Sequence, residues 1–418
     1  MIRHGTPEFR RTTLALFSAG FATFALLYCV QPLMPVFARD FHVSAAESSL
    51  SLSLTTGLLA PAMIVAGVVS EARGRKPMMV ASLLASSLLT LASAFVHRWD
   101  AFLVARTLAG ITFAGLPAVS MTYLSEEVHP TSVGLAMGLA IGGNGLGGMC
   151  GRLLTALLTD FLSWRFAIGT IGVIGLAATA IFWRSLPPSR HFTPHPLRAG
   201  ALARTFWDRL RDSRLMSLYA EGFLLAGAFV TTYNYVSYHL LAAPYAMSQS
   251  AVGFIFVVYL IGIFASAWVG SIAGRAGRRR TLAAMFGLML AGVALTLARP
   301  LAVVVSGIAV VTFGFFGGHS VASAWVGLRA VNAKAQAAAL YLFFYYIGSS
   351  VAGAAGGAFW ASAQWPGVVA FVAAMLGVGL ILCAGIRDPL APGGMSDGVE
   401  PPGGGGARHD YRAARDGA

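Results

Sequence analysis

Long, nearly uncharged apolar blocks run through this chain, and they limit its fold more than any other feature. A helix needs about 20 such residues to cross the hydrocarbon core of a bilayer. The β-strand alternation of a membrane barrel is absent from the blocks, so we expect helices. The sequence therefore predicts an all-α membrane protein with twelve transmembrane helices, at 12–37, 48–70, 78–96, 100–124, 132–159, 165–184, 214–240, 250–273, 280–298, 301–328, 334–360 and 366–386.

The composition supports a membrane protein. Of 418 residues, 57% are apolar and 11% are Asp, Glu, Lys or Arg, whereas soluble domains carry about 25% charged residues. A net charge of +13 would suit nucleic acid in a soluble protein, but here the basic residues lie in short loops between the blocks. We therefore expect a lipid bilayer and no nucleic acid as partner. Three cysteines without metal or redox spacing, Cys29, Cys150 and Cys383, predict no metal and no cofactor.

The positions of lysine and arginine predict the orientation. With the N-terminus inside, 23 of the 29 basic residues lie on the cytoplasmic side and 4 lie outside. Such an imbalance places both termini in the cytoplasm. The first block is too long for the apolar region of a cleaved signal, so we expect it to remain as a span.

The longest internal polar stretch divides the chain. Residues 185–213 hold four prolines and many basic residues, which predicts a cytoplasmic linker between an N-terminal six-helix bundle, 1–184, and a C-terminal one, 214–386. The tail, 387–418, is rich in glycine and proline and is predicted to be disordered.

The two halves carry a repeated loop. The loop after the second block reads GVVSEARGRK from Gly67, and the loop after the eighth block reads GSIAGRAGRR from Gly270, 203 positions later. The first helices of the two halves start 202 positions apart. Parallel repeats of six helices are a known plan of transporters, with the solute site between the repeats. The sequence therefore predicts two pseudo-symmetric bundles.

These loops resemble the motif of the major facilitator superfamily, Gly-x3-Asp-(Arg/Lys)-x-Gly-Arg-(Arg/Lys). The first copy matches at Gly67, Gly74, Arg75 and Lys76, with Glu71 in place of the aspartate. The second copy keeps Gly270, Gly277 and Arg278 and lacks the acid. The resemblance covers about residues 10–386 and implies a monomeric transporter that alternates access to a central site for a small-molecule solute.

Two further motifs resemble the twelve-span drug and sugar exporters of that family. Arg106 and Gly110 match an Arg-x3-Gly motif, and Gly143, Asn144, Gly147 and Gly148 match the antiporter motif Gly-Pro-x-x-Gly-Gly with Asn144 in place of proline. Residues 115–127 and 147–164 are similar to the arabinose-efflux permease branch. The resemblance implies proton-coupled export from a bacterium across its inner (plasma) membrane.

Other functions stay open at this point. The missing proline and a first span without an acid leave room for a proton symporter or a facilitator that takes up a small metabolite. A membrane-embedded enzyme or sensor is the remote alternative. No Gly-x-Ser-x-Gly elbow and no ATP-binding loop occur in the sequence, so we expect no enzyme and no catalytic residues.

The resemblance implies that the loop motif latches the two halves on the cytoplasmic side when the cavity opens outward. Arg75 would then pair with Glu126 or Glu127 at the end of span four. The alternative is that the loop cations only set the topology.

Four ionisable residues inside spans are candidates for proton coupling. Glu221 is the only acid well inside a span and is the best proton carrier, although a partly solvated glutamate near a helix end is an alternative. His319, Arg106 and Arg152 are the others, each with a structural alternative as a packing or hydrogen-bonding residue.

Polar and aromatic residues on the cavity helices are candidates for solute contact. They are Tyr28, Gln31, Asn234, Tyr235, Tyr238, Tyr341 and Tyr345. Such a set suits an amphipathic or sugar-like solute. Two repeats of small residues, Gly134–Gly138–Gly142 and Gly348–Ala352–Gly356, predict close packing of helices.

Overall fold

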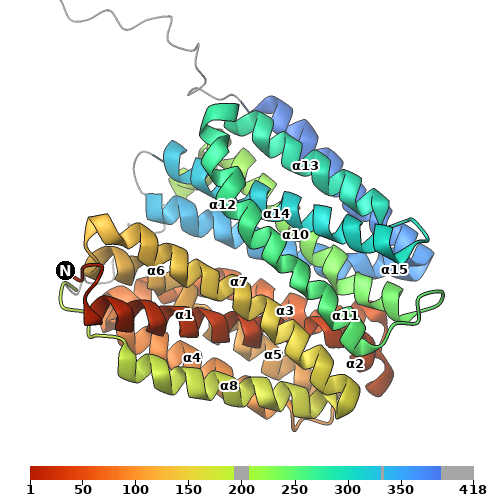
Figure 1. Cartoon of the computed structure of the whole chain (residues 1–418), viewed down its shortest axis with the longest axis horizontal. Coiled ribbons are helices and arrows are strands. Elements are labelled where there is room, and N and C mark those ends of the chain that lie inside the picture. Colours follow the sequence, from red (N-terminus) through yellow and green to blue (C-terminus); the bar gives the residue numbers. More distant parts are fainter. Residues whose placement is uncertain (193–206, 331–333, 387–418) are drawn as a thin grey trace, which may run out of the picture. The chain divides into compact units, whose positions relative to one another are not determined.

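The structure is a computed structural model that describes residues 1–192, 207–330 and 334–386. Within these residues every named element is a helix, and one isolated bridge joins Ile2 to Val128. Figure 1 shows the helices running side by side. The predicted tail and the middle of the predicted linker lie outside the described residues.

The N-terminal helices form six crossings. The first is broken in three, since Pro32 and Pro35 lack the N–H groups that would continue an α-helix. The fourth is interrupted at Ala114, between α5 and α6. The elements are α1 (Pro7–Tyr28), η1 (Gln31–Leu33), α2 (Met34–Asp40), α3 (Ala45–Arg73), α4 (Arg75–Ser93), α5 (Trp99–Phe113), α6 (Gly115–Glu127), α7 (Pro130–Phe161) and α8 (Trp164–Ser185).

The C-terminal helices form six more crossings. The eighth crossing changes to a short 3-10 turn between α11 and α12. The longest helix, α15, breaks at Ala363 and Gln364, so it makes two crossings. The elements are α10 (Ser213–Leu241), α11 (Gln249–Ile255), η2 (Phe256–Val258), α12 (Tyr259–Ala276), α13 (Arg278–Leu295), α14 (Leu301–Arg329) and α15 (Lys334–Gly385).

Length and apolar composition qualify ten of these helical stretches to span a membrane. The ten count α15 once and leave out α13, which begins with three arginines. With α15 divided and α13 included, the described residues make twelve crossings. The prediction of twelve transmembrane helices in the fold of two six-helix bundles is confirmed.

The repeated loop has the same backbone in both halves. Gly74 separates α3 from α4 with φ of 97°, and Gly277 separates α12 from α13 with φ of 88°. A side chain at either position would be strained, because only glycine adopts positive φ without cost. The motif therefore needs its glycines for a sharp turn between two helices.

Small residues bring several helices into backbone contact. A Cβ at Gly143 would lie 2.5 Å from the carbonyl oxygen of Phe17, and one at Gly151 would lie 2.6 Å from the Cα of Ala25, so α7 packs closely on α1. Gly348 meets the backbone of Phe223 on α10 in the same way. The packing predicted for the Gly348 repeat is present.

The other predicted repeat stays uncovered. Nothing among the described residues lies within 4 Å of a Cβ built at Gly134, Gly138 or Gly142. These glycines lie in the half of α7 that follows Pro130. The close packing on α1 uses Gly143, Gly147 and Gly151 instead. The Gly134 repeat therefore does not pack a helix in this conformation.

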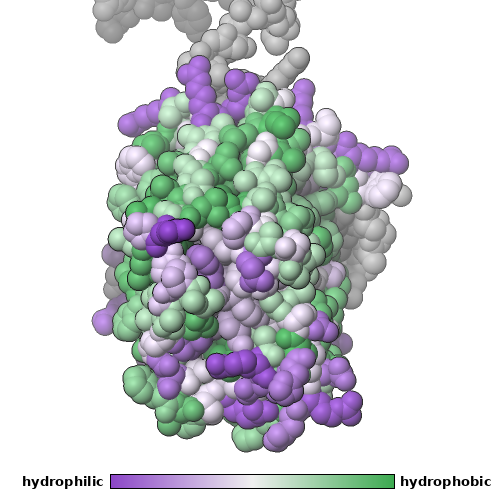
Figure 2. Space-filling view, turned by 90° about the vertical axis from the view of Figure 1, so that its right-hand side faces the viewer, coloured by the Kyte–Doolittle hydropathy of each residue, from purple (hydrophilic) through white to green (hydrophobic). Residues whose placement is uncertain are grey.

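The surface of the helices is apolar. Large hydrophobic side chains such as Val65, Phe95 and Ile381 are 60%, 72% and 73% exposed, which suits contact with lipid. In Figure 2 hydrophobic residues cover much of the upper part of the face, and hydrophilic residues gather at the upper edge, in the middle and toward the lower edge.

Candidate functional site

The ends of the helices define two sides of the molecule, the N-terminal side and the far side. The N-terminal side carries Met1, marked N at the left of Figure 1. The turn at Gly74 is on the same side, because Arg75 pairs with Glu126 and Ile2 bonds to Glu127. The far side carries the opposite helix ends. Helices α1–α8 are called the first half, and α10–α15 the second half.

On the far side, hydrogen bonds hold the two halves together. The hydroxyl of Tyr238 lies 2.8 Å from the carbonyl oxygen of Met34 and 2.6 Å from the hydroxyl of Ser48. The amide of Ser250 donates to Asp160 at 3.2 Å, and the side chain of Gln249 donates to the carbonyl of Pro32. The halves are therefore closed against each other on the far side.

On the N-terminal side, small residues of the same helices are uncovered. No described atom lies within 4 Å of a Cβ built at Gly67 on α3 or at Gly138 on α7. At Gly274 on α12 the nearest described atom is the end of the Arg278 side chain, 3.9 Å away. Contacts like those of the far side are missing at these positions.

A buried chain of polar groups joins the halves between the two sides. Arg152 on α7 donates through Nε to Gln31 Oε1 at 2.6 Å, and Gln31 Nε2 donates to Asn234 Oδ1 on α10 at 2.7 Å. Arg152 is 2% exposed, and both amides are fully buried. Two helices of different halves are thereby linked through the broken part of the first crossing.

Aromatic rings enclose the guanidinium of Arg152. Its Cζ lies 4.1 Å from the ring centre of Tyr28, 4.8 Å from that of Tyr259 and 5.4 Å from that of Phe256. Phe256 and Tyr259 were not among the residues predicted from the sequence. They lie at the 3-10 turn of the eighth crossing, which contains neither proline nor glycine, so no turn signal marks them.

Arg106 lies in a different environment. Its three guanidinium nitrogens donate to the carbonyl oxygens of Ser51, Leu26 and Leu27 at 3.2, 3.3 and 2.8 Å. The carbonyls of Leu26 and Leu27 lose their helical partners where α1 ends at Tyr28. Arg106 therefore satisfies the backbone at this break, as buried carbonyls require.

Glu221 lies inside the second half. It is fully buried, and its Oε1 accepts a hydrogen bond from the thiol of Cys383 at 3.2 Å. Its Oε2 has no partner among the described residues. No described cation forms an ion pair with it, so an ionised Glu221 would be an uncompensated buried charge, which costs several kcal/mol.

His319 and two predicted tyrosines form a cluster that reaches Gly222, the residue after Glu221. The ring of Tyr341 packs on Gly222, next to Glu221 in the chain, and its hydroxyl lies 3.0 Å from Nδ1 of His319. The ring centres of His319 and Tyr345 are 5.0 Å apart. Tyr235 instead donates to the carbonyl of Gly353 at 3.0 Å, within the second half.

The loop motif forms an ion pair at the N-terminal side. Arg75 donates to both carboxylate oxygens of Glu126, at 3.2 and 2.8 Å, and to Ser70 at 2.7 Å. Glu127 is 2% exposed and accepts from the backbone and ring of His191, at 2.8 and 2.9 Å. The two neighbouring glutamates therefore have different partners.

The remaining motif residues are less connected. Lys76 donates to the carbonyl of Leu186, and Gly270 faces the side chain of Ser320. No hydrogen bond or ion pair of Glu71 or Arg278 is found within the described ranges. Asn144, in the antiporter-type motif, lies against Gly20 of α1, and Gly148 accepts from Arg152 at 2.6 Å.

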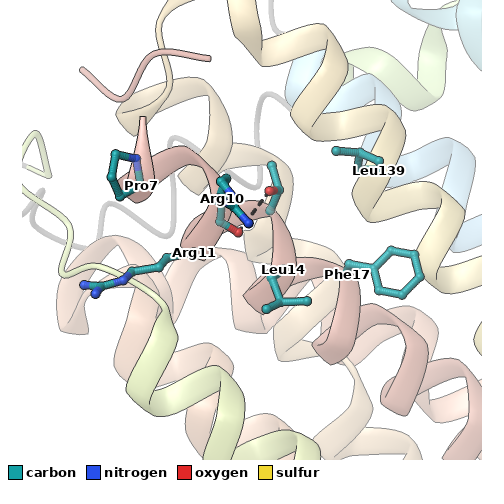
Figure 3. Close-up of a pocket in the computed structure, with 7 residues that line it drawn as sticks. Pro7, Arg10, Arg11, Leu14, Phe17 and Leu139 are labelled. Carbon is teal, nitrogen blue, oxygen red and sulfur yellow. Dashed lines mark hydrogen bonds between the residues drawn. The ribbon is translucent and has the colours of Figure 1, made fainter. Parts of the chain in front are cut away.

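A groove of about 600 Å³ lies on the N-terminal side, away from this chain of polar groups. Figure 3 shows Arg10, Arg11 and Leu14 of α1 on one side of it and Leu139 of α7 on the other. None of the residues predicted to bind solute or protons lines it. Among the described residues no group of His, Cys, Asp or Glu has the arrangement of a metal site.

The amino-acid sequence matches known transporters along most of its length. The chain is 52% identical to the uncharacterised MFS-type transporter YybF of Bacillus subtilis, over 91% of this chain and 94% of that one. It is 48% identical to the inner membrane transport protein YnfM of Escherichia coli, over 91% of each. A shorter match, 27% identical over 54% of each chain, is to the multidrug resistance protein MdtM of Salmonella typhimurium.

The fold matches solved structures as well. A mutant of the nucleoside transporter NupG aligns with a TM-score of 0.75 and 13% identity, over 90% of this chain and 100% of that one. The model of the Major Facilitator Superfamily matches residues 16–352. The chain belongs to the major facilitator superfamily, a family of membrane transporters rather than enzymes.

Proposed function

We propose that the protein is a secondary transporter that exports a small organic solute in exchange for protons. The observation that carries the proposal is the buried chain Arg152–Gln31–Asn234, which places charged and polar groups between the two halves. Such groups are costly inside a membrane protein and normally serve a solute or ion pathway. The partial match to a multidrug resistance protein supports export as the direction.

The unequal contacts of the two sides support alternating access. The far side is held by hydrogen bonds such as that from Tyr238 to Met34, whereas Gly67 and Gly138 are uncovered on the N-terminal side. If the two halves rock around the buried polar groups Arg152, Gln31 and Asn234, the contacts of the far side are lost and contacts on the N-terminal side form. In this proposal the ion pair of Arg75 and Glu126, which lies within the first half, holds the loop in position for the latch of the N-terminal side. We place this side in the cytoplasm with both chain ends.

Glu221 is the proton carrier in this scheme. Its buried carboxyl group lacks a cation among the described residues, so the neutral acid fits its surroundings. A series of contacts leads from Gly222 to Tyr341, from Tyr341 to His319 and from His319 to Tyr345. A proton on Glu221 can therefore affect residues that face the centre of the molecule.

Sealed vesicles that contain the purified protein test this proposal. Solutes are first selected by their ability to raise the thermal stability of the protein, and their uphill movement is then driven by a pH gradient. We expect Glu221→Gln to abolish uphill movement and to leave solute exchange measurable. The matched control is Asp100→Asn, which changes an exposed carboxylate on α5.

The outcomes separate the mechanisms. Uphill transport by Glu221→Gln at the wild-type rate would remove this residue from the coupling step. Solute movement in the same direction as protons would replace export by symport, and movement that ignores the gradient would indicate a facilitator.

A further inference from the structure

Arg152 carries a buried positive charge without a counter-ion. Its partners, Gln31, the carbonyl of Gly148 and three aromatic rings, are all neutral. The described acids form ion pairs elsewhere or form none, and none is with Arg152. The aromatic rings offset part of the cost of burying a cation, but a full charge in this position normally has an anionic partner.

Arg106 shows what a structural arginine looks like in the same protein. It is 1% exposed, and each of its three nitrogens donates to a backbone carbonyl. Arg152 uses only Nε and Nη1, and its Nη2 has no hydrogen-bond partner among the described residues. At Arg152 a whole nitrogen is therefore without a partner among the described residues, whereas every guanidinium nitrogen of Arg106 already has a backbone partner.

Two further donors in this cluster lack partners. The amide nitrogen of Asn234 and the hydroxyl of Tyr259 are buried and form no hydrogen bond within the described ranges. Asn234 is linked to Arg152 through Gln31, and the Tyr259 ring lies 4.8 Å from the Arg152 Cζ. Buried donors in native proteins are almost always satisfied, so the unpaired Tyr259 hydroxyl, beside an Arg152 whose Nη2 forms no hydrogen bond among the described residues, indicates a missing acceptor. The Asn234 amide nitrogen lies instead toward Gly353 on α15.

The geometry points to a binding site for a small organic anion at Arg152, with a carboxylate that accepts hydrogen bonds from Arg152 and Tyr259. Planar guanidinium and carboxylate groups match each other in shape and charge. A single cation selects a monoanion, and the rings of Tyr28 and Phe256 suit an apolar body attached to it. This inference rests on the proposed function, because it names the chemical class of the transported solute.

Matched acids and amides test the inference. The probes are benzoate with benzamide and hexanoate with hexanamide, so that only the charge of the head group changes within each pair. Dissociation constants are measured with detergent-purified, full-length protein. We expect each acid to bind about thirtyfold more tightly than its amide. This factor is at the lower end of the affinity losses caused by removing one partner of a buried charge pair.

Variants assign the preference to a residue. Arg152→Gln should reduce the affinity for both acids to that for the amides, and Tyr259→Phe should weaken the acids by roughly tenfold. The control Arg98→Gln removes an exposed charge of the far side and should leave every constant unchanged. If Arg152→Gln does not fold, Arg152→Lys is the second variant. It keeps the charge but lacks the planar guanidinium, and it should retain only part of the preference for acids over amides.

The inference is overturned if acid and amide bind equally to the wild-type protein, if neither acid binds, or if Arg152→Gln keeps the acid preference. Its failure is distinct from failure of the proposed function. If the protein moves only neutral or cationic solutes uphill, the proposed exporter function stands and the proposed anion site is rejected. If acids bind through Arg152 but a pH gradient drives no movement of them, the anion site stands and proton-coupled export is rejected.

Discussion

Two glycines of α7, five positions apart, predict opposite responses to the same substitution. Gly143 is buried, and a Cβ there would lie 2.5 Å from the Phe17 carbonyl oxygen and 3.0 Å from the Phe17 Cα. Gly138 is on the same helix and has no described atom within 4 Å of its Cβ position. Gly143→Ala and Gly138→Ala therefore differ in their surroundings and not in chemistry.

The magnitude follows from two terms. Replacing glycine by alanine inside a helix favours the folded state by about 1 kcal/mol at either position. At Gly143 the methyl group meets backbone, which cannot turn aside, so α1 must shift by about 1 Å to restore contacts near 3.5 Å. Overpacking of this kind costs about 1–3 kcal/mol. The propensity term cancels between the two variants, and the difference should be about 1–3 kcal/mol.

The assay is the free energy of unfolding of each variant in a denaturing detergent titration, without added solute. We expect Gly138→Ala to be as stable as the wild type or up to about 1 kcal/mol more stable, and Gly143→Ala to be the less stable of the pair. Equal free energies for the two variants, or the reverse order, would refute the close packing of α7 on α1.

Two further predictions concern the gates. Arg75→Ala removes both bonds to Glu126, and we expect slower turnover with unchanged solute affinity in flux and binding assays; loss of affinity alone would argue against a latch. Tyr238→Phe removes the hydrogen bonds to Met34 and Ser48, which should weaken far-side closure by about 1–3 kcal/mol. Ala46 of α3 packs on Gly357 of α15, across the two halves. A cysteine placed at Ala46 should therefore be labelled faster in this variant, and unchanged labelling would contradict the prediction.

Periodicity and charge explain why the fold was predictable. Each crossing is an apolar run of the required length, and the repeated glycine turn at Gly74 and Gly277 marks the two halves in the sequence itself. The breaks were harder to foresee. Pro32 signals the break in the first crossing, but the 3-10 turn at 256–258 has no proline or glycine and depends on packing between the halves.

The site was predictable one residue at a time but not as an arrangement. Arg152, Gln31 and Asn234 stand out as polar residues in apolar spans, yet no local pattern tells that they form one chain across 203 sequence positions. Arg106 and Arg152 look alike in the sequence. Only tertiary structure shows that each guanidinium nitrogen of Arg106 donates to a backbone carbonyl, whereas Nη2 of Arg152 has no hydrogen-bond partner among the described residues.

The uncovered stripe of Gly134, Gly138 and Gly142 has a consequence for the energy balance of the transport cycle. When the far side separates, its hydrogen bonds are lost. The bare backbone of α7 then offers a surface for docking, with no side chain to be moved out of the way. Losses at one end can be matched by gains at the other, which keeps both conformations within a few kcal/mol, as an ion gradient of ordinary size requires.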